Sequence, residues 1–170
     1  TCHLQPEPSN SIRLFIKQYA LDHGLSFYHP RKRLGLLRTM MLRSTQKGQW
    51  MLVIQFYESP EGDGINLLDS VAEKFQEISS IYYAHNTKGN DSIYDLDLKL
   101  HSGDSALTEY MPSALDNGKE LSFKIGPKSF YQTNPAQAHR LYCEVIKLAK
   151  IEKEDIVYDL YTGTGTIALF

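Results

Sequence analysis

The sequence contains little cysteine, and its cysteines are poorly placed to act together. Its 170 residues include only two, Cys2 and Cys143, which lie far apart and belong to no C-x-x-C pair. This spacing gives no support for a disulfide framework, a zinc site or an iron-sulfur cluster, and we expect no metal site in the chain. Cys143 falls inside a helical pattern, where an unpaired cysteine usually packs as a small apolar side chain.

The sequence also lacks a strong charge of either sign and a long apolar run. Its formal net charge is -2 and its pI is near 6.3, so any nucleic-acid contact must depend on a local patch of charge. Nowhere do about 18 apolar residues follow one another, and the N-terminus lacks the basic-then-apolar pattern of a secretion signal. We therefore expect no membrane contact and predict a cytoplasmic protein, and nothing in the sequence indicates a protein partner.

No internal repeat or low-complexity segment is present, and 42% hydrophobic residues are enough for a core. An amphipathic helix is expected over 12–20, with Ser9 or Asn10 as its N-cap, and a hairpin is expected around the "STQKG" turn. A second helix is predicted over 67–75. Further strands are predicted over 79–86, 93–101, 107–111 and 121–126. Together these elements predict a central α+β domain over residues 1–126, with a mostly antiparallel sheet.

From residue 127 the pattern changes. "NPAQ" places a cap at Asn134 and proline at the first helical position. An apolar stripe follows, formed by Leu141, Val145 and Leu148 with Tyr142, Ile146 and Ala149. An apolar strand over 156–160 then leads into a glycine turn. Residues 127–170 thus predict the first helix and strand of a Rossmann-like α/β domain. Because the chain begins with Thr1 and ends just after this turn, we expect it to be a piece of a longer protein.

The glycine turn "GTGTIA" is compatible with three interpretations. Gly163 and Gly165 allow a backbone to approach a ligand closely, as in a dinucleotide fingerprint, which needs an acidic residue about 20 positions further on. A purely structural turn, with Asp159 as its capping residue, is the second. Asp159 favours the third, S-adenosylmethionine, because a carboxylate can hold the ammonium group of that ligand.

Two stretches together, "FKIGPKSFYQTNPAQAHRLY" and "VYDLYTGTGTIAL", resemble the RNA (uracil-5-)-methyltransferase family. That family has an F-[FY]-Q-x-N segment before a helix and, about 25 residues later, D-x-[FY]-x-G-x-G. The stretches "GLLRTMMLR" and "HNTKGNDSIYD" also resemble the central domain of its ribosomal-RNA-modifying members. The resemblance implies a methyltransferase domain that binds S-adenosyl-L-methionine and methylates C5 of a uridine, and it favours 23S rRNA over transfer RNA as the substrate.

The resemblance also implies roles for individual residues. Gln132 is expected to contact the cofactor, Tyr161 to lie against it and Thr166 to reach it, beside Asp159, Gly163 and Gly165. Many relatives have asparagine at the position of Thr166. The nucleophilic cysteine that attacks C6 of uracil and the carboxylate base that removes the C5 proton lie further along the family's chain. We therefore expect no catalytic residue here, and an inactive fragment. An iron-sulfur cluster is conceivable only in the full-length protein.

RNA contacts are expected on the basic residues of the first half, and our prediction places them at Arg31, Lys32, Arg33, Arg38 and Arg43. The alternative is a solvated loop and an ordinary charged sheet face. Two other functions stay open at this stage. One is a complete RNA-binding or scaffold module with a structural glycine turn, and the other is a nicotinamide-dependent oxidoreductase.

Overall fold

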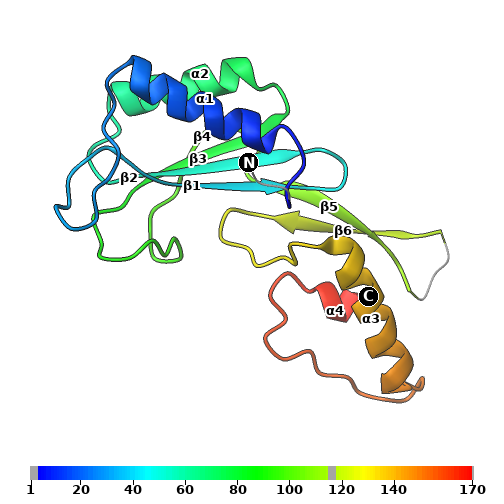
Figure 1. The fold of residues 1–170 in the computed structure, drawn as a ribbon. Coiled ribbons are helices and arrows are strands. Elements are labelled where there is room, and N and C mark those ends of the chain that lie inside the picture. Colours follow the sequence, from blue (N-terminus) through cyan, green and yellow to red (C-terminus); the bar gives the residue numbers. More distant parts are fainter. Residues whose placement is uncertain (1–3, 115–117, 170) are drawn as a thin grey trace. The chain divides into compact units, whose positions relative to one another are not determined.

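The computed structural model describes residues 4–114 and 118–169, which divide into two compact units. The first unit runs to Ser44 and continues from Gly48 to Ser105, and the second contains Thr45–Lys47 and the chain from Ala106 onward. The first contains a four-stranded sheet and two helices, and the second a two-stranded hairpin and two helices (Figure 1). The domain boundary expected near residue 127 stays a prediction about the longer protein.

Helix α1 (Ser9–Asp22) forms where the apolar spacing predicts it, but its N-cap differs from the expected one. Pro8 occupies the cap position, so neither Ser9 nor Asn10 caps the helix. The Glu7 carboxylate takes this role, because it accepts hydrogen bonds from Asn10 Nδ2 at 3.1 Å and from the Ser11 backbone at 3.3 Å. The hydrogen bond from Asn10 is the main cause that lowers the pKa of Glu7.

The sheet of the first unit is mostly antiparallel. Strands β1 (Leu37–Ser44) and β2 (Trp50–Phe56) form the antiparallel hairpin that the sequence predicts. Strand β3 (Ile78–His85) pairs in parallel with β2, and β4 (Lys99–Gly103) pairs antiparallel with β3. Parallel neighbours need a crossover connection, which α2 (Asp63–Lys74) supplies. The predicted mixture of helices with a mostly antiparallel sheet is confirmed.

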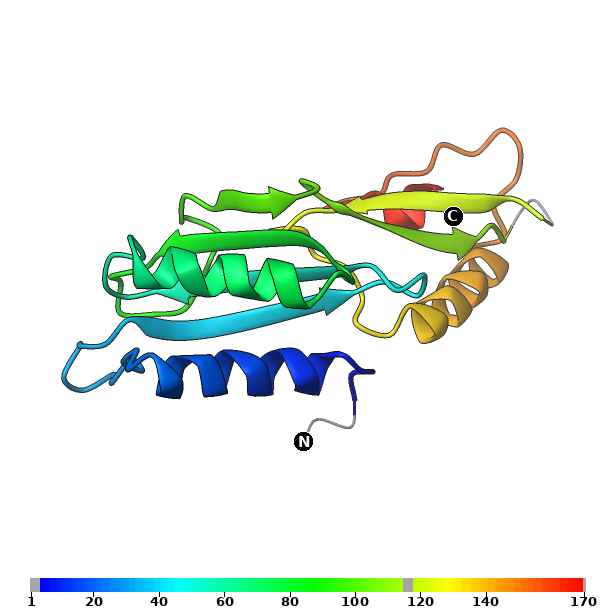
Figure 2. The same ribbon diagram turned by 90° about the horizontal axis from the view of Figure 1, so that it is seen from above.

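Both helices of this unit lie on one face of the sheet, where Figures 1 and 2 show them side by side. Their apolar faces and the sheet share one core. The buried residues of this core include Ile12, Ile16 and Ala20 from α1, Leu67, Leu68 and Val71 from α2, and Leu52, Ile54, Phe56 and Ile81 from the strands. The helical spacing of the apolar residues therefore predicts this core correctly.

The strand predicted over 93–101 is wrong over most of its length. Leu96, Leu98 and Leu100 alternate with polar residues, as in a half-buried strand. Strand β4 nevertheless begins only at Lys99 and ends at Gly103. Before Lys99 the chain forms a turn, in which the Leu96 backbone N–H donates to the carbonyl of Ile93 at 3.2 Å and Lys88 pairs with Asp95. At the other end of β4, Gly103 has a φ of 80°, and a Cβ there would lie 2.1 Å from the carbonyl oxygen of Ser79.

In the second unit, strands β5 (Leu107–Pro112) and β6 (Glu120–Ile125) form an antiparallel pair, and α3 (Pro135–Ala149) packs against it. The predicted cap is confirmed, because Asn134 Oδ1 accepts from the Gln137 backbone at 3.1 Å. The predicted apolar stripe is buried only in part. Tyr142 and Ile146 pack with Ala138 in the core of this unit, whereas Leu141, Val145, Leu148 and Ala149 are exposed, because a two-stranded pair covers only one side of a helix.

No strand forms over 156–160, where one is predicted. Ile156 is 80% exposed, and Val157, Tyr158 and Leu160 are exposed as well. A buried parallel strand needs neighbouring strands for its hydrogen bonds and helices over its faces, and the exposure of these side chains shows that this segment has no such cover among the described residues. After the glycine turn a short helix, α4 (Thr166–Leu169), follows. The truncated Rossmann-like domain stays a prediction.

Over the described ranges, 4–114 and 118–169, the structure contains neither a candidate membrane span nor a cluster of metal-binding side chains. No helix there combines the length and apolar character that a membrane span requires. No three His, Cys, Asp or Glu side chains within those ranges lie close enough together to hold a metal ion. Cys143 is unbridged and packs, partly buried, on the core of the second unit, with its Sγ 3.8 Å from His139 Nε2. Cys2 lies outside the described residues.

Candidate functional site

The glycine turn is present, and its backbone is the unusual one that the sequence suggests. Tyr161, Gly163 and Gly165 have φ angles of 62°, 57° and 74°, in the left-handed region that favours glycine. The Gly165 backbone N–H donates to the carbonyl of Thr162 at 2.8 Å and closes the turn. Nothing comes closer than 3.9 Å to a Cβ built at Gly163, so a ligand has room to approach there. Tyr161 itself is fully exposed, although a non-glycine residue rarely adopts this backbone.

Asp159 lies at the entrance of the turn, and its carboxylate is already in use. Oδ2 accepts a hydrogen bond from the Thr162 hydroxyl at 2.9 Å, which is the capping role considered for this residue. A carboxylate has about four lone-pair positions, so this contact leaves acceptor capacity. The capping role and an ammonium contact are therefore compatible.

Thr166 begins α4 and is the least exposed residue of the turn. Its hydroxyl lies 2.8 Å from the hydroxyl of Thr164, and either group can donate the proton. A threonine hydroxyl is both a donor and an acceptor, so this pair can offer one further hydrogen bond to a ligand.

Gln132 lies between β6 and α3 and is exposed, but its side chain is hydrogen-bonded to the hydroxyl of Tyr142 on α3. Burial raises the pKa of Tyr142, and the bond from Gln132 opposes this shift. Asp159 and Thr166 thus form hydrogen bonds within the glycine turn, whereas Gln132 forms its hydrogen bond to α3. The roles predicted for these residues toward a cofactor stay predictions.

A buried carboxylate close to this segment was missed by sequence reasoning. Glu109 on β5 is 1% exposed and accepts backbone hydrogen bonds from Gln46 at 3.1 Å and from Tyr110 at 2.9 Å. Burial first, and then the charge of Glu109, raise the pKa of Tyr131 to about 12. The sequence does contain a signal that Glu109 would be buried. Side chains alternate along a strand, so in "LTEYM" Glu109 lies on the same face as the apolar Leu107 and Met111.

The basic loop, residues 29–34, is held in one conformation. The His29 backbone N–H donates to Leu34 and that of Arg33 donates to His29, each at 2.8 Å. Gly35 closes the loop against the preceding chain, where a Cβ would lie 2.3 Å from the carbonyl oxygen of Phe27. Arg33 has a φ of 52°, a strained backbone that a well-anchored loop can maintain.

The three cations of this loop are exposed. None of the ion pairs found over the described ranges involves Arg31, Lys32 or Arg33. The loop therefore presents three exposed positive charges, and the contact of Arg31, Lys32 and Arg33 with an RNA phosphate stays a prediction.

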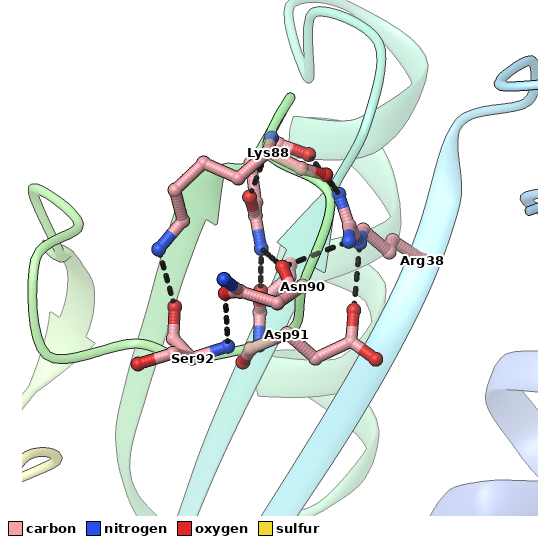
Figure 3. A network of polar contacts seen from close by, with 7 residues as sticks. Arg38, Lys88, Asn90, Asp91 and Ser92 are labelled. Carbon is pink, nitrogen blue, oxygen red and sulfur yellow. Dashed lines mark hydrogen bonds and ion pairs between the residues drawn. The ribbon is translucent and has the colours of Figure 1, made fainter.

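Arg38 has a structural role that the sequence does not reveal. The register of β1 shifts between Leu37 and Thr39, so Arg38 is the extra residue of a bulge, a feature that redirects a side chain. Its guanidinium donates to Asp91 Oδ1 at 2.8 Å and to three backbone carbonyls, those of Asn86, Lys88 and Asn90, at 2.7 to 2.8 Å (Figure 3). Its side chain is only 3% exposed.

The loop that Arg38 holds, residues 86–92, carries a second set of contacts. Asn86 is buried and donates to Gln55 Oε1 at 2.5 Å and to the carbonyl of Asn90 at 3.0 Å. Lys88 extends to the carbonyl of Ser92 (Figure 3). It also pairs with Asp95. "HNTKGNDSIYD" is therefore an ordered loop. An RNA contact by Arg38 stays a prediction, and the structure gives this side chain an internal role.

Arg43, the last predicted RNA contact, is half-buried on β1. Burial lowers its pKa, and the neighbouring Tyr94 raises it to a smaller extent. The guanidinium remains charged, because arginine keeps its proton under all ordinary conditions.

The comparisons with known proteins agree on one class. No family model matches the chain. It is 43% identical over 171 residues to a Porphyromonas gingivalis protein named an uncharacterized RNA methyltransferase, and 41% identical over 172 residues to one of the same name in Bacteroides thetaiotaomicron. These alignments cover 99% of this chain but 35% and 36% of those proteins, so the chain spans about a third of their length.

One solved structure resembles the chain closely. It is the tRNA (uracil-54, C5)-methyltransferase of Pyrococcus abyssi in complex with S-adenosyl-L-homocysteine, with a TM-score of 0.73 and 27% identity. The match covers 99% of this chain and 38% of that one. The chain thus has a fold like that of part of an RNA uracil-C5 methyltransferase.

Proposed function

We propose that this chain is part of an S-adenosylmethionine-dependent RNA methyltransferase that methylates C5 of a uridine. The main support is the left-handed backbone at Tyr161, Gly163 and Gly165, directly after Asp159, in a chain that resembles RNA methyltransferases over 99% of its length. The solved relative binds S-adenosyl-L-homocysteine, the product that S-adenosylmethionine leaves after methyl transfer.

The residues of the turn suit such a cofactor. The unused acceptor positions of Asp159 would hold the ammonium group, a charge-assisted contact of the stronger kind. The open space at Gly163 admits a nucleoside close to the backbone, and the exposed Tyr161 ring can lie against it. Gln132 and Thr166 would supply hydrogen bonds. When bound, the cofactor provides a methyl group on a sulfonium.

The substrate we propose is RNA, on the basis of the relatives' names and the ordered basic loop. A uridine of 23S rRNA is the specific target that the sequence resemblance favours. Transfer RNA is the competing substrate, because the solved relative acts on uracil-54 of tRNA. The nucleophilic cysteine and the base belong to the longer protein in this proposal, and so does any iron-sulfur cluster. The 170-residue chain alone should transfer no methyl group.

The test is methyl transfer by the longer protein that contains this chain. With S-adenosylmethionine labelled in its methyl group, we expect label on C5 of uridine in unmodified 23S rRNA, and less label when Asp159 is changed to Ala. Label that appears only on protein or on small molecules would contradict the proposal. Efficient labelling of transfer RNA but not of ribosomal RNA would contradict the 23S assignment alone.

An RNA-binding or scaffold module is the second candidate. The exposed, ordered cations of the 29–34 loop favour it, because they need no cofactor. In that case the longer protein would bind RNA equally well with and without S-adenosylmethionine and would transfer no methyl group.

A further inference from the structure

The first unit contains a small polar cavity that the proposed methyl-transfer chemistry does not use. Its volume is about 260 Å³, and its lining comes from the basic loop, strand β1 and the 86–92 loop. The lining residues are Tyr28, Pro30, Arg33, Arg38, Thr39, Gly89 and Asp91. We propose that this cavity holds one unpaired nucleotide of the RNA substrate, outside the methyl-transfer site. The inference depends on the proposed function in taking RNA as the ligand.

The size of the cavity limits what it can hold. Pockets that enclose a drug-sized ligand measure about 300 to 1,000 Å³. A cavity of about 260 Å³ is therefore too small for a whole S-adenosylmethionine and suits a single base or a base with its phosphate.

The charges of the lining favour a phosphate-linked ligand. Arg38 is already paired with Asp91 at 2.8 Å, so these two charges largely cancel. Arg33 remains as the surplus positive charge at the wall, since none of the ion pairs among the described residues includes it. A phosphate beside Arg33 would neutralise this charge.

The same wall also carries groups that can contact a base. Tyr28 contributes an aromatic ring, over which the Arg38 guanidinium lies at 4.7 Å from the ring centroid. Aromatic side chains commonly stack on unpaired RNA bases. Asp91 keeps acceptor capacity, since only its Oδ1 binds Arg38. The Thr39 hydroxyl is buried and has no hydrogen-bond partner among the described residues, which is uncommon for a buried polar group.

The cavity is formed in advance rather than by binding. Arg38 fixes the 86–92 loop on one side, and the hydrogen bonds of His29 and Arg33 fix the basic loop on the other. Ordering a flexible loop on binding costs entropy and lowers affinity, and a preformed site avoids this cost.

Gly89 offers a direct way to block the cavity. A Cβ at this position meets nothing within 4 Å and its φ is not in the left-handed region, so a larger residue is tolerated by the backbone. We expect Gly89→Leu to weaken binding of a fluorescein-labelled single-stranded oligouridine by about tenfold, in the range of one lost base contact. Gly89→Ala is the matched control and should bind within about twofold of the wild type. Thr39→Val, a second cavity variant, should also weaken binding.

Salt dependence separates the phosphate contact from the base contact. Arg33→Gln should reduce the slope of log K against log salt by about 0.7, the value for one phosphate of a single strand, and Arg13→Gln on α1 should leave the slope unchanged. Gly89→Leu should lower affinity at every salt concentration without changing the slope.

Three results would overturn the inference. The first is Gly89→Leu and Thr39→Val both binding the single strand as tightly as wild type. The second is an equal loss for a fully paired RNA duplex, since the cavity is proposed for an unpaired nucleotide. The third is free uridine monophosphate binding as tightly as the RNA, which would indicate a small-molecule site. If the longer protein methylates RNA but Gly89→Leu binds normally, only the cavity inference fails. If Gly89→Leu weakens binding but no methyl transfer is found, only the methyltransferase proposal fails.

Discussion

At the scale of single residues, Arg38 shows how one side chain organises a segment far away in the sequence. The bulge in β1 turns it toward the 86–92 loop, where three backbone carbonyls and Asp91 accept from its guanidinium. Its charge also lies over the ring of Tyr28, at 4.7 Å from the ring centroid. A planar group with five donors can satisfy all these acceptors at once, and a lysine ammonium cannot.

Arg38→Lys should therefore destabilise the protein although the charge is kept. We expect a loss of about 2 kcal/mol in the free energy of unfolding, because buried carbonyls would lose their donors. Urea unfolding followed by circular dichroism measures this loss. Arg13→Lys, on the exposed side of α1, is the control and should change stability by less than about 0.5 kcal/mol. Equal unfolding midpoints for the two variants would show that the network contributes nothing.

Gly35 and Gly89 provide a matched pair of glycines in the same unit. Gly35 has a φ of 109° and would place a Cβ 2.3 Å from the Phe27 carbonyl oxygen, whereas Gly89 has neither restriction. Gly35→Ala should cost about 3 kcal/mol or prevent folding, and Gly89→Ala should be nearly neutral. Thermal unfolding of both variants provides the measurement, and a Gly35→Ala protein as stable as wild type would contradict the close approach.

Tyr131 makes stability sensitive to alkaline pH. Its pKa is raised to about 12 in the folded state, chiefly by burial, from an ordinary value of 10.0. The folded state therefore keeps the phenol proton when the unfolded state has lost it, so stability is unaffected below pH 10 and falls between about pH 10 and 12. Tyr131→Phe should reduce this fall. Unfolding midpoints across this range measure it, and an identical fall in both proteins would argue against the raised pKa.

At the scale of the element, local patterns predict the structure where local interactions determine it. The helical spacing of Ile12 and Ile16, and the "NPAQ" cap at Asn134, each depend on residues within a few positions. The predictions fail where the local structure depends on contacts with residues far away in the sequence. Residues 156–160 pair with no strand among the described residues, and before Lys99 the chain forms a turn in which Asp95 pairs with Lys88.

The same distinction between local and distant contacts applies to the candidate site. The positive φ at Gly163 and Gly165 follows from their residue type, so the turn could be foreseen. The bond from Gln132 to Tyr142 and the buried Glu109 could not, because each depends on how α3 and β5 pack in three dimensions.

The start of α3 depends on its cap. Asn134→Ala removes the acceptor of the Gln137 backbone N–H and should cost about 1 kcal/mol of stability. Gln137→Ala is the control, because the cap uses the backbone of Gln137 and not its side chain. Chemical denaturation of the two variants should give a lower midpoint for Asn134→Ala alone. Equal midpoints would mean that the helix start is stabilised by other contacts.

At the scale of the whole molecule, the chain contains two structural units and resembles about a third of a longer protein. The basic loop, residues 29–34, lies in the first unit, and the glycine turn lies in the second. This division suits a protein in which one part holds RNA and another binds the methyl donor. Under the proposed function, methyl transfer would need both parts together with the segment that carries the nucleophile.

The most direct measurement is nucleoside mass spectrometry of RNA from the organism that encodes this chain, with and without the gene. We expect 5-methyluridine at one position of 23S rRNA to disappear on deletion and to return with the intact gene, but to return poorly with the Asp159→Ala variant. An unchanged content of 5-methyluridine in all RNA after deletion would contradict the central claim that this turn serves uridine methylation.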